Sequence, residues 1–216
     1  MLRPTRPKAL HPPGLIRRLI EQVRGREQRM VRAGDDLPIL LLSFPRGKHA
    51  AAEALETAWT HLLRALKPET LAPYADVLRA LPAMVVVVLR PSNVCGCLGH
   101  HHPPGTESRL TRRLQGDLGR AVGEIDLAYE SIRAWEPQPL SSLAASGMGG
   151  RLAALRFQAA LLSVLLHELE HLARGGEGEH TVRTRSNRFY ATVMEELVAS
   201  ESGAAYGMAS RPPPRP

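Results

Sequence analysis

His167, Glu168 and His171 form the pattern HExxH directly after the longest apolar stretch of the chain. Residues four apart lie one above the other on one face of a helix, so both imidazoles can reach a single metal ion. Glu168 lies about 100° further round such a helix, close enough for its carboxylate to hold a metal-bound water. Zinc lowers the pKa of bound water to about 7, and a neighbouring carboxylate can then act as general base. The pattern therefore predicts a zinc site with Glu168 as the catalytic residue.

The apolar run 159–166 comes immediately before these residues and is expected to be buried. Three ionisable side chains at the edge of a core are costly unless a metal or a polar network satisfies them. A pair of histidines packed near the end of an ordinary helix is the alternative. The burial of the preceding run favours the metal.

A catalytic zinc needs three protein ligands and one open position. The region 186–203 is expected to form the next helix, and it carries two adjacent glutamates, Glu195 and Glu196. Helical periodicity places Glu196 on the margin of the apolar face and Glu195 almost opposite that face. We therefore expect Glu196 as the third ligand, while His180 remains a poorly spaced alternative in a loop.

The set His167, Glu168, His171 and a glutamate 25 residues later resembles the gluzincins, the thermolysin-like superfamily of zinc metallopeptidases. The resemblance covers about residues 161–203, and the minigluzincins, small single-domain members, are most similar in size. It implies one catalytic Zn²⁺, a peptide or protein substrate, and Glu196 as the ligand from an NExxSD-type stretch. Glu195 replaces the asparagine of that stretch, and Ser200 stands where an aspartate usually supports the first histidine.

Residues Glu124–Ile132 alternate between apolar and polar side chains, which predicts a half-exposed strand. Ile125, Leu127 and Tyr129 would share one face. In the gluzincins the strand before the metal helix binds extended peptide, so the resemblance implies that these residues form the substrate-binding edge. An ordinary amphipathic strand is the alternative.

A developing oxyanion usually needs a second electrophile. The residues within plausible chain distance are Tyr190, His180, Tyr206 and Arg183, and Tyr190 and His180 are the main candidates. Cys95 and Cys97, followed by His100 to His102, form a second group of metal-binding residue types. We expect a glycine-rich strand end and loop near the active cleft there. A structural metal site, or a cysteine thiolate at the open zinc position, is the alternative.

These residues require an α+β fold: a small mixed sheet with an exposed edge strand, packed against the buried HExxH helix and a following glutamate-bearing helix. The expected domain covers residues 14–208, between a disordered tail at 1–13 and a Pro-rich tail at 209–216. Expected helices cover residues 14–32, 49–66, 69–81, 151–174 and 186–203. Expected strands cover 37–44, 84–89 and 124–132, with 93–101 pairing beside 84–89. Residues 105–119 read as loop or weak helix, and 137–150 as a linker.

The composition, 44% hydrophobic and 23% charged over 216 residues, is that of a soluble globular protein. The net charge of +7 comes from scattered basic residues, aromatic residues make up only 4%, and no nucleic-acid-binding motif is found. We therefore expect no nucleic-acid or membrane partner, and a cytoplasmic location; the oligomeric state is open. The expected function is a zinc-dependent metallopeptidase. The alternative is a catalytically inactive zinc-binding gluzincin-like domain that recognises peptides or regulates a partner, suggested by Glu195 and Ser200.

Overall fold

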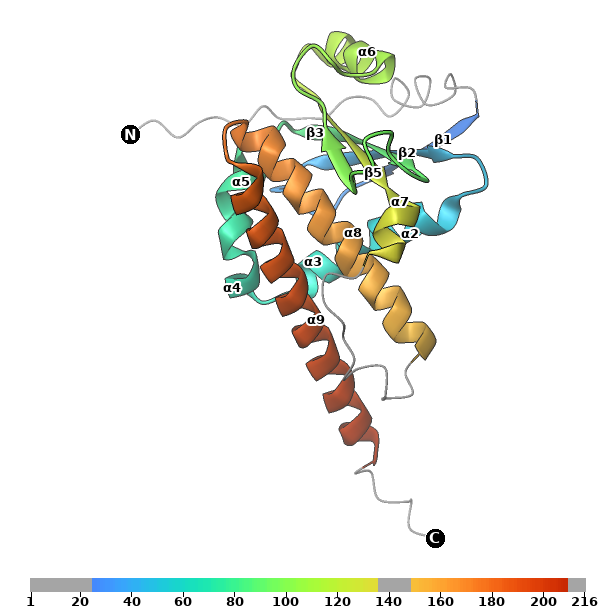
Figure 1. The fold of residues 1–216 in the computed structure, drawn as a ribbon, viewed down its shortest axis with the longest axis vertical. Coiled ribbons are helices and arrows are strands. Elements are labelled where there is room, and N and C mark those ends of the chain that lie inside the picture. Colours follow the sequence, from blue (N-terminus) through green and yellow to red (C-terminus); the bar gives the residue numbers. More distant parts are fainter. Residues whose placement is uncertain (1–24, 136–148, 210–216) are drawn as a thin grey trace.

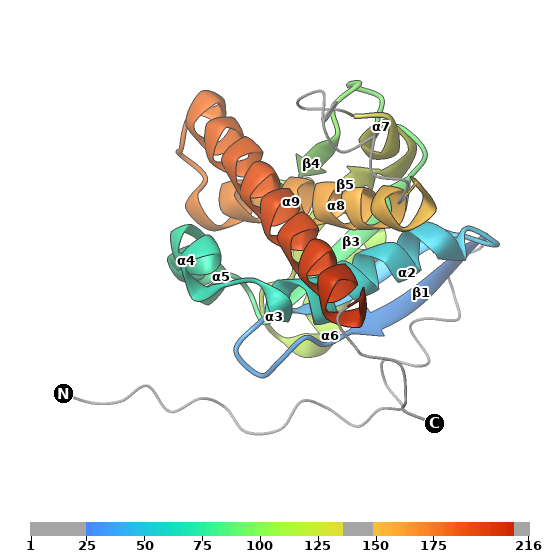
Figure 2. The same cartoon turned by 90° about the horizontal axis from the view of Figure 1, so that it is seen from below.

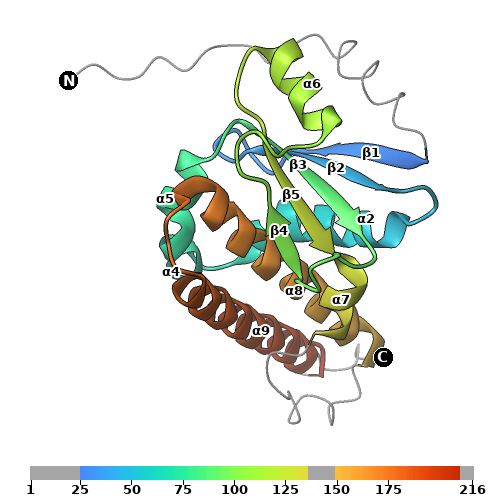
Figure 3. The same ribbon diagram turned by 45° about the horizontal axis from the view of Figure 1, so that its top comes forward.

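The computed structural model describes residues 25–135 and 149–209. The expected tail at 1–13, all but the first residue of the expected tail at 209–216, and nearly all of the expected linker at 137–150 lie outside these residues. Within them a single five-stranded mixed sheet has the order β1-β2-β3-β5-β4 (Figure 3). Its strands are β1 (Arg26–Val31), β2 (Ile39–Pro45), β3 (Met84–Arg90), β4 (Gly99–His101) and β5 (Gly123–Ala128). β2, β3 and β5 are parallel, whereas β1 and β4 run antiparallel at the two edges.

The mixed sheet combined with several helices confirms the α+β class. α6 (Arg109–Leu118) lies on one face, and α8 (Gly149–Arg174), with α9 (Glu179–Ala209) packed against it, lies on the other (Figures 1 and 2). α2 (His49–Thr57) continues into η1 (Ala58–Leu62) and α3 (Leu63–Ala65). The remaining short helices are α4 (Pro68–Leu71), η2 (Ala72–Tyr74), α5 (Ala75–Ala80) and α7 (Tyr129–Ala134).

Two expectations at the edges of the sheet are wrong. Residues 14–24 of the expected helix at 14–32 lie outside the described residues, and residues 26–31 form a strand, because β1 pairs with β2 along its full length. The Arg26 guanidinium also donates to the carbonyl oxygens of Ser43 (2.7 Å) and Leu89 (2.8 Å), so tertiary pairing overrides the helical pattern. The segment 93–101 does not pair with β3. The strand that this segment contains, β4, pairs with β5 instead.

The β5 strand is also not the half-exposed strand that its alternation predicts. It lies between β3 and β4, and all six of its residues are buried. Ile125 and Leu127 pack into the core shared with α8, while Glu124 and Asp126 are buried on the opposite face. Tyr129 is the first residue of α7. The substrate-edge role expected for Ile125, Leu127 and Tyr129 is therefore contradicted, and the sheet edge near α8 is β4.

The α8 helix is the centre of the larger core. Leu161, Leu162, Leu165, Leu166 and Leu169 are fully buried between the sheet and α9. By length and composition alone α8 could cross a membrane, but 61% of its most apolar window is buried inside the fold. The helix ends at Gly175, whose N–H donates to the carbonyl of His171 (2.9 Å) and whose φ of +38° is of the kind that favours glycine.

The α6 helix covers the second, smaller core. Ser108 is its N-cap, with the side-chain oxygen accepting from the Thr111 N–H (3.3 Å), and Gly119 ends it in the left-handed conformation. Leu114 packs against β2 and β3 side chains, with Leu110 and Leu118 beside it. The expected loop or weak helix at 105–119 is thus a capped amphipathic helix.

The α8 and α9 helices are joined by a buried ion pair. Glu170 lies inside the HExxH segment and is 0% exposed; Oε1 of its carboxylate pairs with the Arg185 guanidinium of α9 and with Arg174 (3.4 Å). Arg185 also pairs with Glu177 (3.0 Å) in the turn between the helices. This network ties the start of α9 to the end of α8.

Substituting Arg185→Leu should lower the free energy of unfolding by about 3 kcal/mol, because it leaves the buried Glu170 charge with only the more distant Arg174. Denaturant unfolding measures this difference. Arg188→Leu, an exposed arginine on the same helix, is the control and should change stability by less than about 0.5 kcal/mol. Equal effects of the two substitutions would contradict the role of the buried pair.

Candidate metal centre

His167 and His171 lie on the face of α8 that meets β4 and the first turn of α9. Their rings are 4.8 Å apart between centroids and nearly perpendicular, and their side chains are only 13% and 12% exposed. Two imidazoles one helical turn apart can therefore ligate one ion, as the sequence pattern predicts.

Glu179, the first residue of α9, supplies a third candidate ligand. Its Oε2 atom lies 3.1 Å from Nε2 of His171 and 3.4 Å from Nε2 of His167. One ligand atom from each of the three residues lies within 4.8 Å of the other two. Two histidines and a glutamate are a donor set that catalytic zinc sites use, so these residues fit a zinc ion.

Glu196, the expected third ligand, is not brought to the histidines. Its Oε1 accepts a hydrogen bond from the Thr70 hydroxyl (2.5 Å) and its Oε2 accepts one from the Lys67 N–H (3.3 Å). This carboxylate therefore joins α9 to the start of α4. The difference arises because α9 begins at Glu179, seven residues before the expected start, so that its first turn already reaches the HExxH face.

Ser186 orients His167. The Ser186 hydroxyl donates to the carbonyl oxygen of Arg183 (3.0 Å), so its oxygen can accept from Nδ1–H of His167 (3.3 Å). This tautomer leaves the Nε2 lone pair facing Glu179 and free for a metal. The resemblance places Ser200 where an aspartate usually has this supporting role, but the Ser200 hydroxyl donates to Leu197 O of its own helix (2.8 Å).

Burial and neighbouring charges shift the pKa values of His167 and Glu179 in the direction that favours metal binding. Burial is the main cause that lowers the pKa of His167, and it outweighs the opposing effects of Glu168 and Glu179. Burial would raise the pKa of Glu179, but hydrogen bonds from Arg183 and His171 and the charge of His167 together lower it. At neutral pH the histidine is thus a neutral donor and the glutamate an anion, the states that a metal requires.

Glu168 lies between the metal ligands and the β4 strand. It is 6% exposed, with Oε1 3.9 Å from Nε2 of His167 and Oε2 3.4 Å from Nδ1 of His101. The His101 ring is also stacked on His171, with centroids 5.1 Å apart. A Cβ atom at Gly99 would lie 2.6 Å from Cγ and Oε1 of Glu168, closer than atoms can approach. The backbone of β4 therefore fixes where the Glu168 carboxylate can lie.

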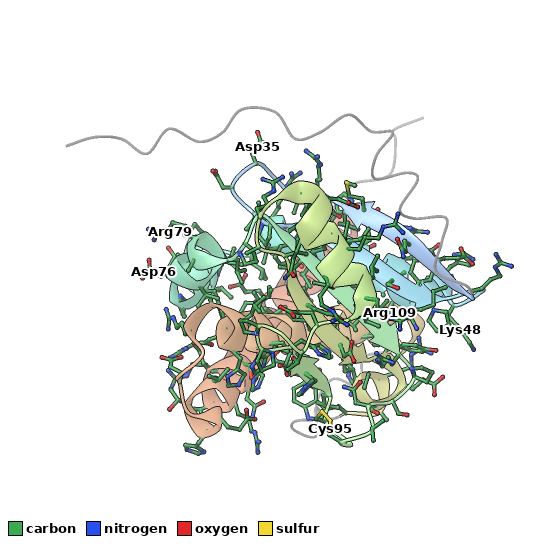
Figure 4. All side chains as sticks on the ribbon, turned by 90° about the horizontal axis from the view of Figure 1, so that it is seen from above. Asp35, Lys48, Asp76, Arg79, Cys95 and Arg109 are labelled. Carbon is green, nitrogen blue, oxygen red and sulfur yellow. A yellow bond between two sulfur atoms is a disulfide. The ribbon has the colours of Figure 1, made fainter. Side chains whose placement is uncertain are left out.

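These groups open onto a cavity of about 620 Å³. Its walls are the segment 95–101, Trp135 and Val164, and Arg183 and Asn187 of α9. The glycine-rich segment thus lies beside the cleft, as expected. Cys95 and Cys97 form a disulfide with each other at the tip of the loop before β4 (Figure 4), so neither thiol is a metal ligand in this structure.

Tyr190 and His180 do not line this cavity. Tyr190 is buried against Trp135, with ring centroids 5.4 Å apart, and His180 lines a separate hollow between α4 and α9. Arg183 does line it, and its guanidinium donates to Oε1 of Glu179 (2.8 Å). The side chain of Tyr206 lies outside the described residues. Of the four electrophile candidates, the described residues thus bring only Arg183 to the site.

The chain matches no protein-family model, and comparisons with curated proteins and with solved structures find no significant match.

Substituting Ser186→Ala should weaken zinc binding about 10- to 100-fold, because His167 loses the acceptor that fixes its tautomer. Competition against a zinc-binding dye measures the affinity. Ser200→Ala, which removes a hydroxyl bonded only within its own helical turn, is the matched control and should leave the affinity unchanged. Unchanged affinity in Ser186→Ala would show that the hydroxyl does not orient the ligand.

Proposed function

We propose that this protein is a zinc-dependent metallopeptidase that hydrolyses peptide bonds. The observation that carries the proposal is the convergence of His167, His171 and Glu179 on one point, with the Glu168 carboxylate buried beside them. Bound zinc would supply an activated water and polarise the scissile carbonyl.

Glu168 would hold the attacking water and take its proton as general base. Its burial and the contact with His101 keep the carboxylate in one place, and Gly99 leaves room for it there. Arg183 would face the substrate from the opposite wall of the cavity, where a guanidinium can stabilise a developing oxyanion.

The β4 strand supports a peptide as the substrate. It is the edge strand nearest Glu168, and it is hydrogen-bonded to β5 along one side. An extended peptide can add to the other side through main-chain hydrogen bonds. Such a peptide would lie beside the strand whose residues Gly99 and His101 contact Glu168, so the edge-strand role moves from the expected residues of β5 to β4.

The departures from the thermolysin-like pattern no longer favour an inactive domain. The role assigned to Ser200 is available from Ser186, and the ligand role assigned to Glu196 is available from Glu179. A domain that only binds peptides does not need a general base. The buried position of the Glu168 carboxylate beside the candidate metal ligands therefore favours the peptidase over the inactive domain.

Substituting Glu168→Gln should lower kcat for peptide hydrolysis by about 10²- to 10⁴-fold, because the amide cannot take a proton. Turnover of a broad library of quenched fluorescent peptides by the zinc-loaded protein measures it. Zinc stoichiometry and the unfolding midpoint should remain those of the unsubstituted chain. A zinc-loaded protein that cleaves no member of the library would overturn the proposed activity.

Substituting Glu179→Gln should lower zinc affinity at least tenfold, because Glu179 contacts both histidines. Glu196→Gln should leave the affinity unchanged, because Glu196 is bonded to Thr70 instead. Elemental analysis after dialysis against a weak chelator compares the two variants. Loss of zinc from Glu196→Gln with retention in Glu179→Gln would restore the ligand set expected from the sequence.

A further inference from the structure

A second group of metal-binding residue types lies on the opposite face of the sheet from α8. His102 directly follows β4, and Glu124 and Asp126 are on β5, with one ligand atom from each residue lying within 4.8 Å of the others. We propose that these three residues, the β4–β5 cluster, form a second site for a divalent transition-metal cation, separate from the candidate zinc site.

The cluster contains buried polar atoms that nothing satisfies among the residues that the structure describes. Asp126 is 8% exposed, and its Oδ1 atom has no hydrogen-bond partner. Nε2 of His102 has none either, and the nearest acidic atom, Oδ2 of Asp126, is 3.5 Å away. Buried polar atoms are rarely left without partners, because desolvation then costs free energy that no bond returns. A cation would satisfy both atoms at once.

The hydrogen bonds that the cluster does make leave these atoms free. Arg90 donates to Oδ2 of Asp126 (2.7 Å). Glu124 is 1% exposed, and Oε2 of its carboxylate accepts the Ser108 N–H (2.8 Å). The Arg26 guanidinium also lies near Asp126, but it donates to the oxygens of Ser43 and to Leu89 O. Neither guanidinium therefore donates to Oδ1 of Asp126, and that atom still lacks a partner within the described part of the chain.

The donor set indicates the class of cation. One imidazole and two carboxylates suit Zn²⁺, Mn²⁺ and related divalent ions, whereas Ca²⁺ and Mg²⁺ prefer all-oxygen sites. The three residues belong to β5 and to the residue directly after β4, so a bound ion would fasten the short edge strand to the sheet. His101, adjacent to His102, faces the candidate zinc site, and the second ion would therefore hold β4 in its position against Glu168.

A rearranged hydrogen-bond network is the competing way to satisfy these atoms. A protonated His102 could pair with Asp126, and the cluster would then be a hydrogen-bonded network without metal. A metal site and a hydrogen-bonded network differ in the number of cations bound per chain. The ligands of the candidate zinc site must be removed first, so that any cation still bound can be assigned to the β4–β5 cluster.

The test uses the full chain with His167→Ala and His171→Ala, which removes two ligands of the first site. Titration with Zn²⁺, and separately with Mn²⁺, should show one remaining cation per chain, and the bound ion should raise the unfolding temperature. Adding His102→Ala should weaken this binding at least tenfold and abolish the thermal shift. Adding His61→Ala, an exposed histidine on η1, should change neither.

Glu124→Gln on the same background provides a variant of nearly equal shape. Its amide oxygen can still accept the Ser108 N–H, so the fold should persist while the cation affinity falls at least tenfold. A chain without His167 and His171 that binds neither cation would overturn the proposal, as would equal binding by the His102→Ala and His61→Ala variants. Neither result would bear on zinc at the first site, which the Glu168 and Glu179 variants test separately.

Discussion

Two imidazoles and two carboxylates project from the central helix of the main core, and each needs a polar partner because burial keeps most or all water away from it. The partners come from the elements on either side of α8. Glu179 and Ser186 of α9 face the two histidines, Arg185 of α9 pairs with Glu170, and His101 of β4 faces Glu168. The positions of α9 and β4 are therefore fixed by the polar groups of α8 as well as by apolar packing.

The β4 and β5 strands distribute polar groups to both faces of the sheet. Side chains alternate along a strand, so His101 lies on the α8 face beside Glu168 while His102 lies on the other face beside Asp126. On β5 the same alternation sends Ile125 and Leu127 into the main core and Glu124 and Asp126 toward α6. A single pair of strands thus borders the candidate zinc site on one face and the β4–β5 cluster on the other.

Local patterns in the sequence are sufficient for the features that depend on neighbouring residues. The four consecutive valines of β3 and the apolar run of α8 predict buried elements, and HExxH predicts two facing imidazoles. The third candidate ligand depends on where α9 begins, and that start is set by the turn after Gly175 and by ion pairs such as Glu170–Arg185. An acidic residue just after a glycine-rich turn is a known signal for a helix start, and Glu179 fits it.

The alternating residues of β5 correctly predict a strand with two different faces, but they wrongly predict that one face is exposed to water. Polar residues at every second position usually face water, but Glu124 and Asp126 are covered by the segment that leads into α6 and are paired with Ser108 and Arg90. Whether a polar residue of a strand is buried depends on partners that are distant in the sequence, and the periodicity of the strand itself does not reveal those partners. The same holds for β1, where cross-strand hydrogen bonds to β2 replace the helix that its spacing indicates.

The close approach of Gly99 to Glu168 has a consequence for how this fold can diverge. A single methyl group at position 99 would overlap the present position of the Glu168 side chain, and the three atoms nearest to it all belong to that residue. A residue without a reactive group of its own thus controls the space that the proposed general base occupies. In any chain that shares this arrangement, the size of the residue at this point of the edge strand would decide whether a glutamate can lie beside the two histidines.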